Sequence, residues 1–395
     1  MKRWLTLFLG AAALVGTEAS RSSDKPSFSQ APAPRSRLAD GFSYNHEALA
    51  EGPWSVQVIR IRRDRSDLGI HVLLGGGHQL GVATLSSQAS NFPRAQGQAL
   101  AALNGDFFAR GGPCLGDPEG LCIRDGEFIS APNGKSAFWM GPDRSLHLGP
   151  VVSLLSMIAP DGTSLAIGLN EERQERPVLF TAAVGPRTPS SQGTEYLFIA
   201  EAGSALPIRP GLRSTFRLHS VHSGGNTLIP TNGVVLSLPI RNEVSPTQTA
   251  PGSLWTLSTE TRPNLKNTPT ALGGGPALLK DGQPTQFQSS DARHPRSAIG
   301  WNAEFFFLLQ VDGRQRGQSV GMSLAELAAH FTRLGCTDAL NLDGGGSSTL
   351  WARGQVMNTP CEGSERPMGN ALLITLEPGA VEPRSFQSVP EAKTH

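Results

Sequence analysis

The residues best suited to chemistry surround a run of three glycines. Residues 341–348 read Asn-Leu-Asp-Gly-Gly-Gly-Ser-Ser, so the carboxylate of Asp343 stands directly before the run. Glycines expose backbone N–H groups and let a ligand approach without Cβ atoms in the way, so such a loop can bind a phosphate or another oxyanion. On its own, a glycine run is an equally good sign of a tight turn. The candidate ligand-binding members of this loop are Gly344, Gly345, Gly346, Ser347 and Ser348.

Three arginines favour the anion-binding interpretation. Arg296 lies in a His-Pro-Arg-Ser-Ala segment, Arg314 follows Asp312-Gly313, and Arg366 lies in a polar loop. Guanidinium groups bind phosphate oxygens in a bidentate way. Each could instead be a surface arginine in an ordinary ion pair. A nucleophilic serine in the glycine loop is disfavoured, because the G-x-S-x-G pattern is absent.

An earlier segment repeats the theme of polar residues beside glycine. Residues 103–108 read Leu-Asn-Gly-Asp-Phe-Phe and follow a small apolar run, Ala99–Ala102, that predicts a strand. Asn104 and Asp106 are therefore expected at the end of that strand, beside two aromatic side chains of the core.

The elements that must position these residues form a strand–helix–strand unit near residues 304–342. Residues 304–311 (EFFFLLQV) predict a buried strand that stops at Asp312. Residues 324–334 predict a helix, with a capping box at 323–326 and Gly335 as its stop, and 338–342 predict a second strand that stops at Asp343. If the two strands are parallel, both aspartates lie at one edge of the sheet, where ligands bind in open sheets. An antiparallel arrangement would place them at opposite ends.

The rest of the chain predicts β-structure. Gly 45 and Pro 30 give a turn-rich composition. Residues 54–74 predict two strands around a polar turn, and residues 150–260 contain several short apolar runs separated by turn residues. We therefore expect an α+β fold, with a β-rich mixed sheet.

Taken together, the motifs resemble the phosphodiester glycosidase family. The resemblance covers roughly residues 99–375 and adds Asn358 to the candidate ligand-binding residues. The resemblance implies a catalytic domain over 46–376. Within it, residues 150–260 match only as generic β-structure. The motifs that carry it are Asn104-Gly105-Asp106-Phe107-Phe108, Gly274-Gly275-Pro276, Pro295-Arg296-Ser297-Ala298-Ile299-Gly300, Val311-Asp312-Gly313-Arg314, Gly321-Met322, Asn341 to Thr349, and Arg366.

The resemblance implies cleavage of the C1–O bond between a sugar and a phosphodiester, which releases the sugar and a phosphomonoester. A phosphate leaving group needs charge stabilisation more than protonation. The sugar develops oxocarbenium character, so a carboxylate is needed as nucleophile or base. We rank Asp343 first, Asp106 second and Asp312 third.

Two other functions remain open. The three aspartates could hold a divalent ion in a metal-dependent phosphodiesterase, or the chain could be a non-catalytic glycan-binding protein. No cofactor is expected for the glycosidase, and a divalent cation is required only by the first alternative. The expected partner is a carbohydrate phosphodiester, on a cell surface or in an extracellular polymer. Lys+Arg 34 against Asp+Glu 33 gives a formal charge of +1, so nucleic acid is not an expected partner.

The N-terminal residues predict an export signal. Lys2 and Arg3 precede an uncharged apolar run, and small residues near Ala19 fit a cleavage site. We therefore expect a signal peptide over 1–19, a Pro/Ser-rich linker over 20–45 and a loose tail over 377–395. No later apolar stretch approaches the length of a transmembrane helix, so a periplasmic or extracellular protein is expected.

Four cysteines fit an oxidising compartment. Local pairing predicts disulfides between Cys114 and Cys122 and between Cys336 and Cys361, one of three possible connectivities. A zinc site is the weaker interpretation, because no C-x-x-C motif is present.

Overall fold

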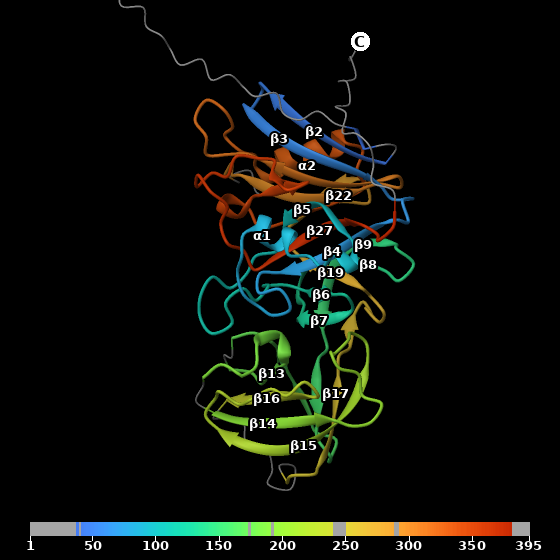
Figure 1. Cartoon of the computed structure of the whole chain (residues 1–395), viewed down its shortest axis with the longest axis vertical. Helices are drawn as coiled ribbons and strands as arrows, with labels where there is room; N and C mark the ends of the chain where they lie inside the picture. The colour runs from blue at the N-terminus through green and yellow to red at the C-terminus, as the bar shows by residue number, and fades with distance from the viewer. Residues whose placement is uncertain are drawn as a thin grey trace, which may run out of the picture. The chain divides into compact units, whose positions relative to one another are not determined.

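A computed structural model describes residues 37–38, 41–172, 175–190, 193–239, 250–287 and 292–380, and these residues form four β-sheets (Figure 1). One compact unit spans Arg35–His395. Two α-helices occur in the described residues, α1 (Leu85–Ser90) and α2 (Leu324–Arg333). Three short 3-10 helices accompany them: η1 (Arg94–Gln96), η2 (Ala182–Val184) and η3 (Gly345–Ser347).

The strand–helix–strand unit lies in an eight-stranded sheet. Its strands follow the order β1 (Arg37–Leu38), β2 (Phe42–Leu49), β3 (Trp54–Arg62), β23 (Phe305–Val311), β22 (Arg296–Trp301), β24 (Asp338–Asn341), β20 (Ala277–Lys280) and β21 (Gln283–Pro284). β22 lies between β23 and β24 and is antiparallel to both, so β23 and β24 run in the same direction. The parallel arrangement is therefore confirmed, and Asp312 and Asp343 both follow the carboxyl ends of their strands.

Helix α2 forms where its local sequence predicts it. The Ser323 side chain accepts a hydrogen bond from the Glu326 N–H at 3.2 Å, and the Glu326 carboxylate accepts one from the Ser323 N–H at 2.9 Å. Leu327, Ala328 and Phe331 are buried and pack into the same cluster as strand residues of the sheet. Helical spacing of apolar residues and a capping box thus place this helix on the sheet.

A five-stranded antiparallel sheet carries the second group of candidate residues. Asn104 is the last residue of β5 (Gln98–Asn104). Strand β27 (Asn370–Leu376) begins at Asn370, directly beside the segment that holds Asp106. The predicted strand at 99–102 is confirmed within β5. The strand order is β26 (Gln355–Val356), β25 (Leu350–Ala352), β5 (Gln98–Asn104), β27 (Asn370–Leu376) and β4 (Leu68–Leu74).

Two further sheets contain most of the middle of the chain. The six-stranded sheet has the order β18 (Thr261–Arg262), β9 (Leu146–Ser153), β8 (Asn133–Met140), β19 (Thr270–Gly273), β6 (Cys122–Arg124) and β7 (Glu127–Ser130). The second eight-stranded sheet has the order β11 (Ser164–Ala166), β10 (Ser156–Ile158), β17 (Leu254–Ser258), β15 (Arg213–Ser223), β14 (Gly193–Ala200), β16 (Gly233–Pro239), β13 (Val178–Phe180) and β12 (Gly168–Leu169). The β-structure predicted over 150–260 is confirmed.

The predicted fold class is confirmed in part. The protein is β-rich, but two α-helices of 6 and 10 residues among the described residues are too small a share to define an α+β fold. The sheets are also less mixed than expected. Among the described strands, β12 and β13 form the sole parallel pair. The predicted parallel strands do not pair directly, because β22 is inserted between them.

The ordered sheet begins inside the range expected for the linker. β2 starts at Phe42 rather than after residue 45, because Phe42 and Tyr44 are buried in the core with Ile59 and Ile61. The expected signal peptide, most of the linker and the tail beyond residue 380 lie outside the described residues. Neither α-helix of the described chain has the length and apolar character needed to span a bilayer.

The predicted disulfides are not present, and all four cysteines are free. Cys114 packs in a cluster with Val178 and Phe180, whereas Cys122 lies in the main core cluster. Cys336 lies in the cluster under α2. Cys361 is 3.9 Å from an Arg314 nitrogen. Each sulfur thus lies in surroundings of its own, and nearness in sequence does not bring the predicted partners together.

Candidate active site

Asp343 presents a buried carboxylate with one oxygen that no protein group bonds. Its side chain is 3% exposed, and its backbone N–H donates to the Gly105 carbonyl at 3.0 Å. Oδ1 accepts a hydrogen bond from the Gly344 N–H at 2.9 Å. Oδ2 has no hydrogen-bond partner among the described residues, and the nearest cation is Arg110, whose Nη2 lies 3.8 Å away. Oδ2 is therefore the buried oxygen of Asp343 whose hydrogen-bonding capacity the described residues leave unused.

Burial raises the pKa of Asp343 above its usual value. The Ser347 hydroxyl, Arg110, the Gly344 N–H and Arg366 each lower the pKa, but together they do not offset burial. The Ser347 hydroxyl is close to the carboxylate, although no hydrogen bond reaches Oδ2. The Asp343 carboxyl group is therefore held in a dry position, where its ionised form is less well solvated than that of a surface carboxylate.

The glycine loop does not form the expected cradle of backbone donors. The Gly344 N–H donates to Asp343, and the Gly345 N–H donates to the Pro295 carbonyl at 2.9 Å. The N–H groups of Ser347 and Ser348 each donate within the loop at 3.2 Å, because residues 345–347 wind into η3. Four donors of the loop are thus used inside the protein, and the binding of an oxyanion by the loop stays a prediction.

The glycines instead let arginines come close to the loop. A methyl group at position 346 would overlap Arg366 Nη2 and Glu362 Oε1. Gly345 has φ +61°, and a Cβ there would lie 3.1 Å from Arg314 Nη2. Both arginines were predicted from the sequence, and the structure brings both to the loop.

Arg366 and Arg314 differ in how firmly they are held. Arg366 is ion-paired with Glu362, and its Nη1 donates to the Ser347 hydroxyl at 3.4 Å. Arg314 is exposed, and its Nη2 lies 3.3 Å from His294 Nδ1. Arg366 is therefore positioned next to Asp343, whereas Arg314 forms the outer side of the loop.

Arg296 supports the backbone beside the loop. Its Nε donates to the Met322 carbonyl at 2.9 Å, and its Nη2 donates to the Ala292 carbonyl at 3.0 Å. Its Cδ would lie 3.9 Å from a Cβ at position 344. These contacts favour a bracing role over the predicted contact with phosphate.

Arg110 is a site residue that the sequence analysis did not identify. Its guanidinium faces Asp343 and lies 5.9 Å from the centre of the Phe108 ring. The side chain is 59% exposed, so a ligand can reach it. The available signal was its position two residues after the Asn-Gly-Asp-Phe-Phe motif.

Asp106 is buried, and both of its oxygens are bonded. Oδ1 accepts from the Phe107 N–H at 2.8 Å and Oδ2 from the Gly120 N–H at 2.9 Å. Burial raises the pKa of Asp106 to about 7, against the lowering effect of those two bonds, and the negative charges of Glu119 and Asp343 add to the rise. Asp106 thus interacts with Asp343 through charge while it fixes the segment around residue 120.

Asn104 ties three segments of the site together. Its Nδ2 donates to the Asp343 carbonyl at 2.7 Å, and its Oδ1 accepts from the Ser297 hydroxyl at 2.6 Å and the Thr349 N–H at 3.1 Å. Its side chain is 1% exposed. Asn104 therefore positions the loop that carries Asp343, and a substrate contact from it is not favoured.

Asp312 and Asn358 form a separate brace. Asn358 Nδ2 donates to the Ser348 carbonyl at 3.1 Å and to Asp312 Oδ1 at 3.3 Å. Asp312 also accepts from the Ser55 hydroxyl at 3.0 Å and the Thr359 N–H at 3.1 Å. Because both oxygens of Asp312 are bonded, its role is to hold the end of the glycine loop, in contrast to the expected catalytic role.

Unpartnered polar atoms gather around Asp343. Within nine residues, four buried oxygens have no hydrogen-bond partner among the described residues. They are Asn341 Oδ1, Asp343 Oδ2, Ser348 Oγ and Thr349 Oγ1. Leaving such atoms unbonded is costly, and native proteins tolerate it mainly where function requires it. This concentration makes the region around Asp343 the leading candidate for ligand binding.

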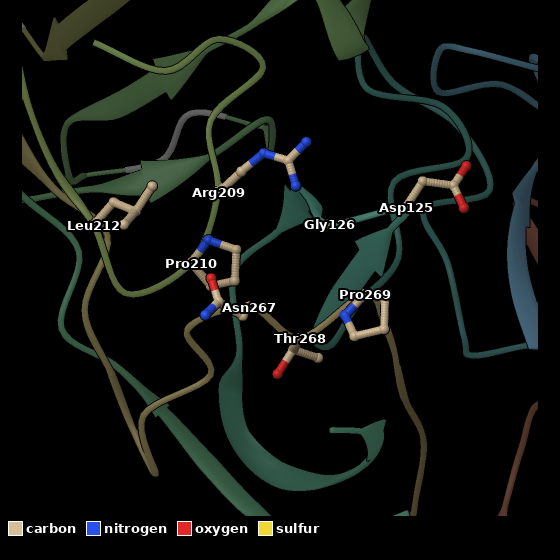
Figure 2. Close-up of a pocket in the computed structure, with 8 residues that line it drawn as sticks. All are labelled: Asp125, Gly126, Arg209, Pro210, Leu212, Asn267, Thr268 and Pro269. Carbon is tan, nitrogen blue, oxygen red and sulfur yellow. The ribbon is translucent and has the colours of Figure 1, made fainter. Parts of the chain in front are cut away.

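A separate pocket of the described surface lies away from these residues. The pocket in Figure 2, of about 180 Å³, is lined by loops around Arg209 and Thr268, and the Arg209 side chain extends toward Gly126. The Asp125 carboxylate at its rim lies 3.3 Å from His71 Nδ1. None of the candidate residues lines this pocket.

The described side chains contain no group of three or more His, Cys, Asp or Glu placed to hold a metal ion. Asp106, Asp312 and Asp343 in particular do not form such a group. Their oxygens are directed to different hydrogen-bond partners.

Fold and site together define a β-rich protein in which a buried carboxylate stands beside arginines, an arrangement fitted to phosphate-bearing ligands. Residues 215–375 match the family model of phosphodiester glycosidases, which confirms the resemblance seen in the sequence. The match includes Asp343 and Arg366 but not Asp106 or Arg110.

Relatives support the fold more than the function. The SPbeta prophage-derived uncharacterized protein YomE of Bacillus subtilis (strain 168) is 32% identical over 116 residues, which is 28% of this chain and 18% of that protein. A hypothetical protein from Synechocystis has a TM-score of 0.69 at 21% identity, over 85% of this chain and 62% of its own. A Burkholderia pseudomallei K96243 protein, provisionally described as exported, has a TM-score of 0.60 at 21% identity, over 82% and 74% of the two chains.

Proposed function

We propose that this protein is an exported hydrolase that cleaves the C1–O bond of a glycosyl-1-phosphodiester in a cell-surface or extracellular glycan. The products are the free sugar and a phosphomonoester. The observation that carries the proposal is Asp343, buried, with an unpartnered oxygen that lies 3.8 Å from Arg110. A cation and a free carboxylate oxygen side by side suit a substrate that separates into an anionic phosphate and a cationic sugar.

Arg110 and Arg366 stabilise the leaving phosphate. When the C1–O bond breaks, its electron pair stays on the phosphate oxygen, and guanidinium groups offset the charge that develops. A phosphate ester is a good leaving group, so no strong general acid is required. Arg366 is already oriented by Glu362 and Ser347, which lowers the cost of ordering it.

Asp343 acts on the anomeric carbon, as a nucleophile or as the base that activates water. Its Oδ2 has no hydrogen-bond partner among the described residues, whereas both oxygens of Asp106 accept backbone hydrogen bonds. Water supplies the oxygen that ends on C1, and its second proton ends on the phosphomonoester or in solvent. Asp106 supports the site through its charge and through the hydrogen bonds that it accepts from the N–H groups of residues 107 and 120.

The metal-dependent phosphodiesterase is less well supported. It requires Asp312 as a ligand, and that carboxylate is occupied by Ser55, Asn358 and Thr359. A glycan-binding protein without activity leaves the unpartnered Asp343 oxygen and its arginines without a role.

The test is a set of glycosyl-1-phosphodiesters that differ in sugar, with sugar and phosphomonoester measured as separate products. We expect equal amounts of the two products from at least one substrate, with loss of both in the Asp343→Asn variant. Glu304→Gln, a change at an exposed position outside the site, is the matched control and should behave as wild type. Release of both products by Asp343→Asn at the wild-type rate would reject this assignment of the site.

A further inference from the structure

Glu362 places a negative charge among the arginines of the candidate active site. Its carboxylate accepts hydrogen bonds from Nε of Arg366, at 3.1 Å, and from Nη2 of the same arginine. The Glu362 side chain is 44% exposed, compared with 24% for Arg366. The proposed cleavage needs cations for the leaving phosphate, and it does not by itself explain an anion in this position.

The glycine loop brings this carboxylate close to a second arginine. A Cβ on the last glycine of the loop would overlap both Glu362 Oε1 and Arg366 Nη2. A Cβ on the glycine before it would lie 3.1 Å from Arg314 Nη2. Arg314 Nη1 also lies 3.9 Å from the sulfur of Cys361, the residue that precedes Glu362. The two guanidinium groups and the Glu362 carboxylate therefore lie against consecutive residues of one loop.

A third arginine acts on the same carboxylate through its charge. The hydrogen bond from Arg366, together with the positive charges of Arg366, Arg314 and Arg110, lowers the pKa of Glu362 below its usual value. Arg110 in turn lies 3.8 Å from Asp343 Oδ2. When both carboxylates are ionised, they offset two of these three positive charges. Glu362 thus sets how much positive charge the three arginines present to a phosphate.

Substrate and product of the proposed reaction differ in charge. A phosphodiester carries one negative charge, whereas a phosphomonoester carries about 1.5 to 2 near pH 7, because its second pKa is about 6. Three arginines without a nearby carboxylate would favour the product, since Coulomb attraction grows with the charge of the ligand. Slow release of a tightly held product limits turnover in many enzymes.

We propose that Glu362 is a specificity-determining residue, whose charge makes the site discriminate against a phosphomonoester dianion relative to a phosphodiester monoanion. Repulsion between Glu362 and the second negative charge of the product favours product release. The inference rests on the proposed function for the identity of substrate and product. The competing explanation is that Glu362 only orients Arg366, as an exposed ion pair can do.

Calorimetric titration with dimethyl phosphate and methyl phosphate tests the inference without requiring hydrolysis. Both probes are titrated at low ionic strength and at about pH 8, where the first is a monoanion and the second a dianion. The measured quantity is the ratio of the two dissociation constants, because an effect on all phosphates alike cancels in it. We expect Glu362→Gln to shift this ratio about three- to fivefold in favour of methyl phosphate, as one partly exposed charge interaction allows.

Two further variants separate charge from orientation. Glu362→Asp keeps the negative charge, so it should stay close to the wild-type ratio. Glu304→Gln removes an exposed charge outside the site and should leave the ratio unchanged. If Glu362 only oriented Arg366, Glu362→Gln should weaken the binding of both probes alike. Because Glu362 is exposed, its variants should fold, and the thermal midpoint checks this.

An unchanged ratio in Glu362→Gln, or the same shift in Glu304→Gln, would overturn the inference. Hydrolysis of a glycosyl-1-phosphodiester with an unchanged ratio would leave the proposed function in place. A shifted ratio in a protein that hydrolyses no glycosyl phosphodiester would reject the proposed function and keep the discrimination by Glu362. Absence of binding of both probes to every variant would overturn the inference, while the hydrolysis assay would still decide the proposed function.

Discussion

At the scale of single residues, the site depends on which oxygens remain unbonded. Three aspartates follow strand ends beside glycine, and the sequence does not tell them apart, because the groups that bond them lie far along the chain. Gly120 satisfies Asp106, and Ser55 and Asn358 satisfy Asp312. Asp343 was ranked first from its place before the glycine loop, and it alone of the three keeps a free oxygen. Arg110 was missed because its one sequence signal, the position two residues after the Asn-Gly-Asp-Phe-Phe motif, is weak for a single exposed arginine.

Replacing Asp343 tests its charge. Asp343→Asn keeps the shape of the side chain and removes the negative charge, so kcat should fall roughly a thousandfold while substrate binding is largely kept. Steady-state and binding measurements on the same protein check this. Asp312→Asn should instead lower the thermal midpoint, because it disturbs a carboxylate that accepts several hydrogen bonds. If the two variants exchanged these effects, the ranking of the aspartates would be wrong.

The pH profile tests the environment of Asp343. The carboxylate acts in its ionised form and its pKa is raised, so activity should be lost with falling pH above the ordinary carboxyl range. Arg110 favours the ionised form, so Arg110→Ala should raise this pKa further and move the acid limb of kcat/KM to higher pH. Arg110→Lys should restore most of the shift, and Arg94→Ala, at an exposed position elsewhere, should not move the limb. If Arg110→Ala left the acid limb of kcat/KM unchanged, the charge interaction between Arg110 and Asp343 would be contradicted.

At the scale of elements, local signals predicted well and long-range ones did not. The capping box at Ser323 and the helical spacing of apolar residues are complete within α2, so the helix was predictable. The position of β22 between β23 and β24 depends on strand pairing across the sheet, and no local sequence pattern predicts it. The glycine loop shows the same limit, because the sequence did not predict that residues 345–347 wind into η3 or that Gly345 and Gly346 leave room for arginine side chains.

Two glycine variants separate crowding from backbone strain. Gly346→Ala should displace the Arg366 guanidinium and raise KM with little change in thermal midpoint, because the overlapping atoms end flexible side chains. Gly345→Ala places a Cβ at φ +61°, so it should destabilise the fold by about 1–2 kcal/mol. Thermal unfolding and kinetics measured together check both. Unchanged KM in Gly346→Ala would mean that Arg366 does not contact the substrate.

At the scale of the whole molecule, composition predicted β-structure but not four sheets. Strands such as β3 and β23 pair although well over half the chain separates them, and such contacts leave little trace in the local sequence. The cysteines show the same limit. Cys114 and Cys122 are close in sequence but lie in different hydrophobic clusters. Nearness in sequence therefore did not predict the state of the cysteines, which are free.

The thiols give a prediction for the folded protein. Cys361 is partly exposed, whereas the other three cysteines are buried, and burial raises the pKa of Cys114 and of Cys336 to about 12. An alkylating reagent should therefore modify Cys361 first in native buffer, and all four cysteines in denaturant without a reductant. Intact mass measures the labels. Fewer than four labels in denaturant would show a disulfide that the structure lacks.

The position of bond cleavage tests the central claim most directly. Hydrolysis of a glycosyl-1-phosphodiester in water enriched in ¹⁸O shows by mass spectrometry which product takes up the solvent oxygen. Attack at the anomeric carbon, assisted by Asp343, predicts the label in the sugar and none in the phosphomonoester. Label in the phosphomonoester would mean that the P–O bond breaks, and would contradict the assignment of Asp343 to C1.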